Sequence, residues 1–381
     1  MRSRVVIVCA VSAIAVAGCS GVRPVAGRAA PPSVPAPGST PPPTQPAAAS
    51  TTPPAPAGVT LAFTGDMLVS DALRARAAAN AGGRGFDFGP MLAEIAPVLR
   101  AADWAVCHQE TPISADNTAL AGWPSFSAPY QLAEAIRAAG WDACSTASNH
   151  TVDRGQAGVK STLDSLDRVG LRHTGSARNA AEAGRTTVYD VGSVRIGHSS
   201  WTFGTNGIAP PAAWSVNLID TARIRADARR LRAVGAEFVV VSLHFGEEKD
   251  QRPTAYQRQV VDEVLRTPDV DLVIGHHAHV VQPIHRRPDG RWVVYGLGNL
   301  LAQQELMAGE GRTPPHRDGL LVRVTIAPGP AGRWAVSRVG YVPTFVDAPS
   351  DVVRLAPPFS RSRTSAVVRS MGAPVVDDTP G

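Results

Sequence analysis

The sequence is poor in cysteine, shows no internal repeat and carries no strong excess of charge. Its 381 residues include four cysteines, and 37 Lys and Arg against 32 Asp and Glu give a net charge of +5. The basic residues are scattered along the chain, so we expect no nucleic-acid partner. Cysteine ligands for a structural zinc are also absent. A single large domain is the expected organisation.

The cysteines divide into two pairs. Cys9 and Cys19 lie in the N-terminal segment, whereas Cys107 and Cys144 lie in apolar runs further along the chain. A disulfide between the second pair is permissible in an exported protein. Because neighbouring parallel strands rarely offer disulfide geometry, we expect two buried thiols instead.

The N-terminus has the layout of an export signal over residues 1–19. Arg2 and Arg4 precede an apolar stretch over residues 5–16, which at about a dozen residues is too short to span a bilayer. The string Val16-Ala17-Gly18-Cys19 resembles the lipobox of bacterial lipoproteins, which implies cleavage before Cys19 and lipidation of its thiol. The alternative is an ordinary cleaved signal. Either way the globular part is expected to be exported, and with the lipid it is anchored on the outer face of the cell membrane.

The composition of the chain sets the expected domain boundaries. Residues 20–58 are dominated by Pro, Ala, Ser and Thr, which cannot bury enough apolar surface to fold, so they are expected to form a disordered tether. Residues 59–357 form the domain. Residues 358–381 are expected to be a flexible tail.

Apolar runs alternate with helical patterns through the domain. This alternation predicts an α/β fold with a parallel sheet, and the later hairpins predict a second, mixed sheet. Pro97 is expected to divide the helical pattern of residues 88–101. Strands are expected over residues 59–64, 104–107, 142–146, 187–190, 194–199, 238–243, 270–274, 292–295, 320–326 and 334–342, and further helices over 129–139, 157–169, 221–234 and 255–266.

Polar motifs follow several of these strands directly, where a sheet brings strand ends together. Carboxylates, an amide and imidazoles in this position suit Mn, Fe or Zn, and two ions about 3.5–4 Å apart are consistent with so many donors. The motifs contain Asp66, Glu110, Asn149 with His150, His244, and the cluster His276, His277 and His279.

These motifs resemble the CapA family of poly-γ-glutamate capsule synthesis proteins, which is related to calcineurin-like metallophosphoesterases. The resemblance runs in order from about residue 59 to 302. It implies a metallophosphoesterase-like sandwich of two mixed β-sheets flanked by helices. The segments that carry it are Gly65-Asp66-Met67-Leu68, Glu110-Thr111-Pro112, Ser148-Asn149-His150, Phe203-Gly204-Thr205-Asn206-Gly207, His244-Phe245-Gly246-Glu247-Glu248, Gly275-His276-His277-Ala278-His279 and Tyr295-Gly296-Leu297-Gly298-Asn299.

The resemblance also implies roles for single residues. His150 would protonate a leaving oxygen or stabilise a phosphoryl group, Asp153 would orient His150, and water activated by metal would be the nucleophile. Glu110 would stand near the place of a bridging carboxylate. The metal ligands implied are Asp66, Glu110, Asn149, His244, His276, His277 and His279.

Several assignments stay open at this point. Two of the three histidines in the cluster are expected to be ligands, and alternation along an extended segment favours His277 and His279. The family has Asn-Leu before the glutamate where this chain has His108-Gln109, which makes His108 a candidate extra ligand. Glu247 and Glu248 either order the loop after His244 or belong to the site.

Two classes of function are consistent with these features. In the first, an exported lipoprotein acts in the synthesis, export or anchoring of an anionic envelope polymer of the poly-γ-glutamate type, with a metal-dependent phosphoesterase-like hydrolase site. Its partners are then that polymer or a phosphoester substrate, and the membrane through the N-terminal lipid. The alternative is a non-catalytic polymer-binding or scaffold lipoprotein. A fold alone does not decide between them.

Overall fold

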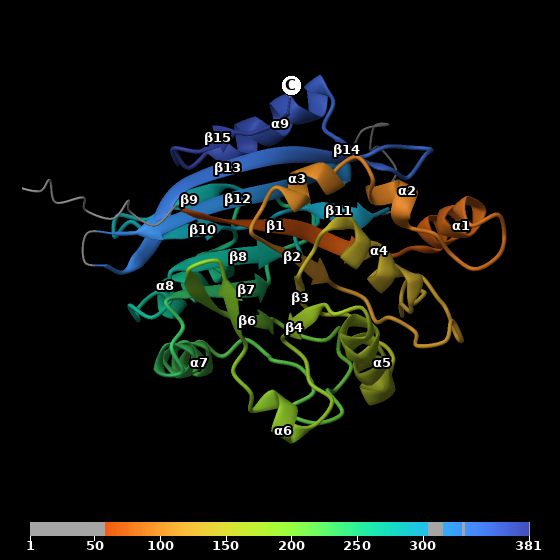
Figure 1. Cartoon of the computed structure of the whole chain (residues 1–381), viewed down its shortest axis with the longest axis horizontal. Helices are drawn as coiled ribbons and strands as arrows, with labels where there is room; N and C mark the ends of the chain where they lie inside the picture. The colour runs from red at the N-terminus through yellow and green to blue at the C-terminus, as the bar shows by residue number, and fades with distance from the viewer. Residues whose placement is uncertain (1–57, 304–314, 330–331, 381) are drawn as a thin grey trace, which may run out of the picture. The chain divides into compact units, whose positions relative to one another are not determined.

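A computed structural model of the chain describes residues 58–303, 315–329 and 332–380. In this part of the chain the strands form two sheets with helices packed outside them (Figure 1). The expected sandwich of two mixed β-sheets flanked by helices is therefore confirmed. The expected signal peptide, the lipidation site Cys19 and the tether before residue 58 lie outside the described residues.

The larger sheet has nine strands within the described residues. Strand β1 is central, because it pairs antiparallel with β12 on one side and parallel with β2 on the other. The main path of this sheet is β14 (Val353–Leu355), β13 (Trp334–Val346), β12 (Asp318–Pro328), β1 (Val59–Leu68), β2 (Trp104–Gln109), β3 (Ala143–Ser145) and β4 (Arg172–Thr174), with β11 (Asn299–Ala302) beside β1 and β15 (Val376–Asp377) beside β13.

The smaller sheet has six strands in the same part of the chain, and β6, β7, β8 and β10 run parallel. The predicted second sheet is mixed, because β5 and β9 pair antiparallel with their neighbours. The later hairpins divide between the two sheets: β9 and β10 extend this sheet, and β12 and β13 extend the larger one. Local periodicity does not specify which open edge a hairpin completes. The spatial order is β5 (Val188–Val191), β6 (Val194–Thr202), β7 (Phe238–His244), β8 (Leu272–His276), β10 (Trp292–Val294) and β9 (Ile284–Arg286).

The helices largely follow the predicted pattern. Pro97 lies in the first turn of α3 and separates it from α2, as expected. No helix in the described ranges is long and apolar enough to cross a membrane. The helical elements are α1 (Asp71–Asn80), α2 (Gly89–Leu92), α3 (Ala96–Arg100), α4 (Gln131–Ala139), α5 (Gly155–Arg168), α6 (Ala180–Ala183), α7 (Thr221–Ala233), α8 (Ala255–Val264), α9 (Pro358–Arg369) and the 3₁₀ turn η1 (Pro315–Arg317).

The central core lies between the two sheets. Leu61 and Phe63 of β1 pack there with Phe238 and Val240 of β7. The alternate side chains of β1, such as Ala62, pack on the opposite face against the helices. Because both faces of β1 are buried, its sequence is a nearly continuous apolar run. Asp66 follows this run, and the packing of β1 on both faces fixes its position.

The expected flexible tail is an ordered part of the fold as far as residue 380. Helix α9 is fixed to β12 by two buried contacts to Asp318: Ser360 Oγ donates a hydrogen bond of 2.6 Å, and Arg363 Nε lies 2.6 Å from the carboxylate. Strand β15 then pairs parallel with β13. The composition of the tail could not predict these contacts, because they depend on the buried carboxylate of Asp318, 42 residues before Ser360.

The expectation of two free thiols is also wrong. Cys107 of β2 and Cys144 of β3 form a disulfide. The two residues are direct partners in the parallel pair, and their Cα atoms are 4.4 Å apart, at the short end of the range that a disulfide spans.

Candidate metal centre

The site forms where strands of both sheets end. In the larger sheet Asp66 of β1 pairs with His108 of β2, and in the smaller sheet His244 of β7 pairs with His276 of β8. Parallel strands end at one edge of a sheet, so each sheet contributes two adjacent polar side chains. Glu110 follows β2 by one residue, and all five side chains are buried.

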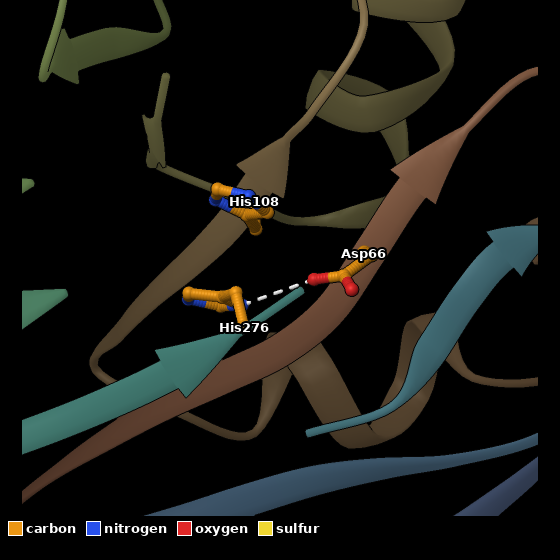
Figure 2. Close-up of side chains that lie close together, drawn as sticks. All are labelled: Asp66, His108 and His276. Atoms are coloured by element: carbon orange, nitrogen blue, oxygen red, sulfur yellow. Dashed lines mark ion pairs between the residues drawn. The ribbon is translucent and has the colours of Figure 1, made fainter. Parts of the chain in front are cut away.

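Asp66, His108 and His276 form the first donor group (Figure 2). One ligand atom from each residue lies within 4.8 Å of the others. Asp66 Oδ1 is 3.3 Å from His276 Nδ1, and the rings of His108 and His276 stack with centroids 4.0 Å apart. The three side chains thus converge on one small volume.

A second donor group contains Asp66, Glu110 and His279. His279 Nδ1 is 3.3 Å from Asp66 Oδ2, and His279 Nε2 is 3.7 Å from Glu110 Oε1. Asp66 therefore belongs to both groups and presents a different oxygen to each. A third group, Glu248 with His277 and His279, continues from the second.

His244 and Asn149 connect to the first group by a chain of hydrogen bonds. His244 Nε2 is 2.8 Å from Asn149 Oδ1, and His244 Nδ1 is 2.9 Å from His108 Nε2. His108 Nδ1 is in turn 2.8 Å from Ser145 Oγ. The structure thus places both predicted ligands beside the donor groups, and their role as ligands stays a prediction.

The histidine cluster does not follow an extended path. His277 and His279 both have positive φ, 87° and 53°, in the left-handed region that a histidine rarely adopts. The expected alternation along a straight segment was therefore wrong, although both residues do share the group with Glu248. Backbone strain of this kind concentrates at functional sites.

Burial and neighbouring charges set the protonation of the cluster. Burial opposes the charged form of Asp66, but His276 and His279 beside it hold the pKa of this carboxyl well below its usual range. Burial raises the pKa of Glu110 well above its ordinary value, against the effect of His279. Burial lowers the pKa of His277 to about 3, so its ring is neutral and able to bind a cation at neutral pH.

A divalent cation fits this donor set. Asp66 Oδ1, both oxygens of Glu110, and the Nδ1 atoms of His276 and His277 are buried and accept or donate no hydrogen bond within the described chain. Leaving so many buried polar atoms unpaired is costly, and a cation satisfies them together. Mixed carboxylate and imidazole donors suit Mn, Fe or Zn.

His150 and Asp153 form a pair next to the donor groups, as predicted. His150 Nδ1 donates to Asp153 Oδ2 at 2.8 Å, and the same oxygen accepts the Phe126 backbone N–H at 2.8 Å. The ring of Phe126 meets His150 edge to face. These two contacts fix the orientation of the imidazole ring and leave Nε2 as the nitrogen that Asp153 does not contact.

Sequence reasoning undervalued three residues. His108, weighed only as an extra ligand, lies in the first donor group, and Glu248 lies in the third. Asn299 Oδ1 accepts a hydrogen bond of 2.9 Å from His279 Nδ1, which turns His279 Nε2 toward Glu110. The signal for His108 was its position two residues before Glu110, because alternate residues of a strand face the same side.

Curated relatives of this chain carry capsule-synthesis names. Over 183 residues it is 28% identical to "Capsule biosynthesis protein CapA" of Bacillus anthracis, covering 47% of this chain and 44% of that one. Over 260 residues it is 25% identical to "PGA biosynthesis protein CapA" of Bacillus subtilis, covering 64% and 63%. The matched region spans less than two thirds of either relative.

Among solved structures the chain is similar to a phosphatase from Mycoplasma pneumoniae, with a TM-score of 0.46, 13% identity, and coverage of 77% of this chain and 95% of that one. It is also similar to the calcineurin-like phosphoesterase YfkN of Bacillus subtilis, with a TM-score of 0.42, 12% identity, and coverage of 75% and 90%. The sequence profile described as "Bacterial capsule synthesis protein PGA_cap" matches residues 60–304, which include every donor residue named above. The chain therefore belongs to this family of bacterial capsule synthesis proteins.

Proposed function

We propose that this protein is a metal-dependent hydrolase that acts on a phosphoester or related bond during the synthesis, export or anchoring of an anionic envelope polymer. The observation that carries the proposal is the double use of Asp66. Its Oδ1 faces His276 and its Oδ2 faces His279, each at 3.3 Å. One carboxylate shared by two donor groups is the arrangement expected of a two-metal site.

The donor residues divide between the two groups. His108 and His276 would complete the first group, and Glu110 and His279 the second, with Asp66 common to both. Divalent ions held by these residues would supply Lewis-acid polarisation of a phosphoryl oxygen and an activated water. The chain itself supplies buried imidazoles and carboxylates, the donor types that bind a divalent cation.

His150 is the proposed general acid that would protonate the leaving group. Asp153 accepts a hydrogen bond from Nδ1, which leaves Nε2 as the nitrogen that would exchange a proton with the leaving group. Asn206 Nδ2 lies 3.5 Å from both ring nitrogens and Asn149 Nδ2 donates to Asn206 Oδ1 at 3.1 Å, which ties this pair to the rest of the site.

Family membership and the names of the relatives support an anionic capsule polymer as the context of this activity. The chain is expected to work outside the cytoplasm, held on the outer face of the membrane by a lipid on Cys19. Labelling cells with a fatty-acid probe tests this anchor. Label is expected on the wild-type protein and should be missing from Cys19→Ala; label that persists in the variant would reject the anchor.

Metal analysis together with a panel of phosphomonoesters and phosphodiesters tests the hydrolase itself. The wild-type protein should retain a transition metal and turn over at least one substrate class. Asp66→Asn should lose both. Asp190→Asn is the matched control, since this carboxylate is 87% exposed and lies away from the donor groups. If Asp66→Asn keeps the metal content and turnover of the wild type, the proposal is wrong.

A further inference from the structure

A cavity of about 620 Å³ is lined by residues outside the three donor groups. Residues of β4, α6, β6 and α7 contribute to its lining. We call it the β4–β6 cavity. Its volume is typical of a ligand pocket.

Positive charge dominates the lining of this cavity. Five arginines and three carboxylates line it, and the carboxylates are already used: Glu182 and Asp167 pair with Arg178, and Asp227 pairs with Arg230. The unneutralised arginines are Arg172, Arg185 and Arg223, which form no salt bridge with any other described residue.

Two of these arginines are held by aromatic rings. The Arg172 guanidinium lies 4.3 Å from the centroid of the Tyr189 ring, and that of Arg223 lies 5.6 Å from the centroid of Trp201. Stacking of this kind fixes a guanidinium while its N–H groups stay available to an anion. The arginines are therefore partly arranged for a ligand in advance.

A buried histidine forms part of the cavity wall. His198 is only 1% exposed, and its Nδ1 has no hydrogen-bond partner within the described ranges. Its Nε2 is 2.9 Å from Ser242 Oγ on β7. Its unpaired Nδ1 therefore adds a buried polar atom to the wall of the cavity.

The cavity is also close to the site of the proposed reaction. Its wall at Thr174 and Gly175 rests on the segment that leads to Asn149: Thr146 N donates to Thr174 O at 2.9 Å, and a Cβ on Gly175 would stand 2.6 Å from Ala147 N. The wall of the cavity therefore packs directly against the segment that positions Asn149.

We propose that the β4–β6 cavity binds a carboxylate-rich stretch of the anionic polymer, with Arg185 and Arg223 as its main contacts. Planar guanidinium groups match carboxylates with paired hydrogen bonds. This assignment of the ligand rests on the proposed function, whereas the presence of an anion site rests on the cavity alone.

The test is a calorimetric titration of the purified protein with a γ-linked glutamate oligomer, which measures the dissociation constant. The double variant Arg185→Gln/Arg223→Gln should bind at least about tenfold more weakly, as expected for two lost charge-assisted contacts. Both arginines are exposed, so their replacement leaves the core intact. Arg229→Gln is the matched control: it is an exposed residue of α7 outside the cavity and should bind as the wild type does.

Two further arms separate this proposal from the hydrolase. Asp66→Asn should bind the oligomer as tightly as the wild type, and a wild type that binds the oligomer but turns over no phosphoester would leave the cavity assignment standing. Oligomer binding that is unchanged in the double arginine variant, or lost in Asp66→Asn, would overturn it. Tighter binding of polyphosphate or inorganic phosphate than of the oligomer would overturn the choice of a carboxylate ligand.

Discussion

Cys107 and Cys144 stand opposite each other on β2 and β3 as a disulfide, and the next residue on each strand belongs to the hydrogen bond between His108 and Ser145. The disulfide therefore links β2 and β3 covalently at the position directly before His108, a residue of the first donor group. It closes a loop across 37 positions of sequence.

Removing this disulfide should lower both the stability of the fold and the affinity for metal. By chain entropy, Cys107→Ala/Cys144→Ala should lower the free energy of unfolding by about 3–4 kcal/mol. Metal affinity should also fall, because His108 is held less firmly. Guanidinium unfolding and metal titration measure the two effects, and wild type treated with reductant is the control that should match the variant. Wild-type affinity in the double variant would show that the disulfide does not position His108.

Glu110→Gln should change stability in opposite directions with and without metal. In the chelated protein both buried oxygens of Glu110 lack a hydrogen bond to any described residue, so its neutral replacement should leave the melting temperature unchanged or higher. With metal present the variant should gain less stability, because it lacks a charged ligand. Thermal melts with and without chelator check this. The exposed Glu134→Gln serves as control and should show the wild-type gain; an equal gain in Glu110→Gln would exclude Glu110 as a ligand.

His150→Ala should separate proton transfer from metal binding. Loss of a general acid is expected to lower kcat by about 10²- to 10⁴-fold. Metal content should stay that of the wild type, because His150 is not part of any donor group. Asp153→Asn should give a smaller loss of kcat, because it leaves the imidazole in place and removes only the charged partner of Nδ1. If His150→Ala loses metal in proportion to activity, His150 has a structural or ligand role instead.

His198 should make stability depend on pH. Burial lowers the pKa of His198 to about 3 in the folded protein, whereas in the unfolded chain it is near 6.5. The unfolded state therefore takes up this proton first, and stability falls as the pH drops from 6.5 toward 3. His198→Gln removes the proton site and should lose about 2–3 kcal/mol less than the wild type between pH 7 and pH 4.5. Denaturant unfolding at the two pH values measures the difference, and parallel losses in both proteins would contradict this assignment.

Much of the fold was predictable because the long elements have clear periodicity. The run Val239–Leu243 predicted β7, and the apolar spacing of residues 255–266 predicted α8. Short elements were missed: β4 has three residues and α6 has four, too few to show a period.

Relations between distant parts of the chain were the harder problem. The sequence motifs located Asp66, Glu110 and His279 at strand ends, but only the packing of the two sheets brings them within reach of one cation. The same holds for Asp318 with α9 and for the disulfide. Each depends on which strands are neighbours, which local patterns do not encode.

The position of β12 limits how far the domain can be shortened. The family profile ends at residue 304, yet β12 begins at Asp318 and pairs with β1 from Val59 to Thr64. A fragment cut at the end of the profile would leave the strand that carries Asp66 with an open edge, prone to pair with other chains. A fragment intended for the study of the metal centre should therefore keep the C-terminal strands, because without them aggregation would replace the native fold.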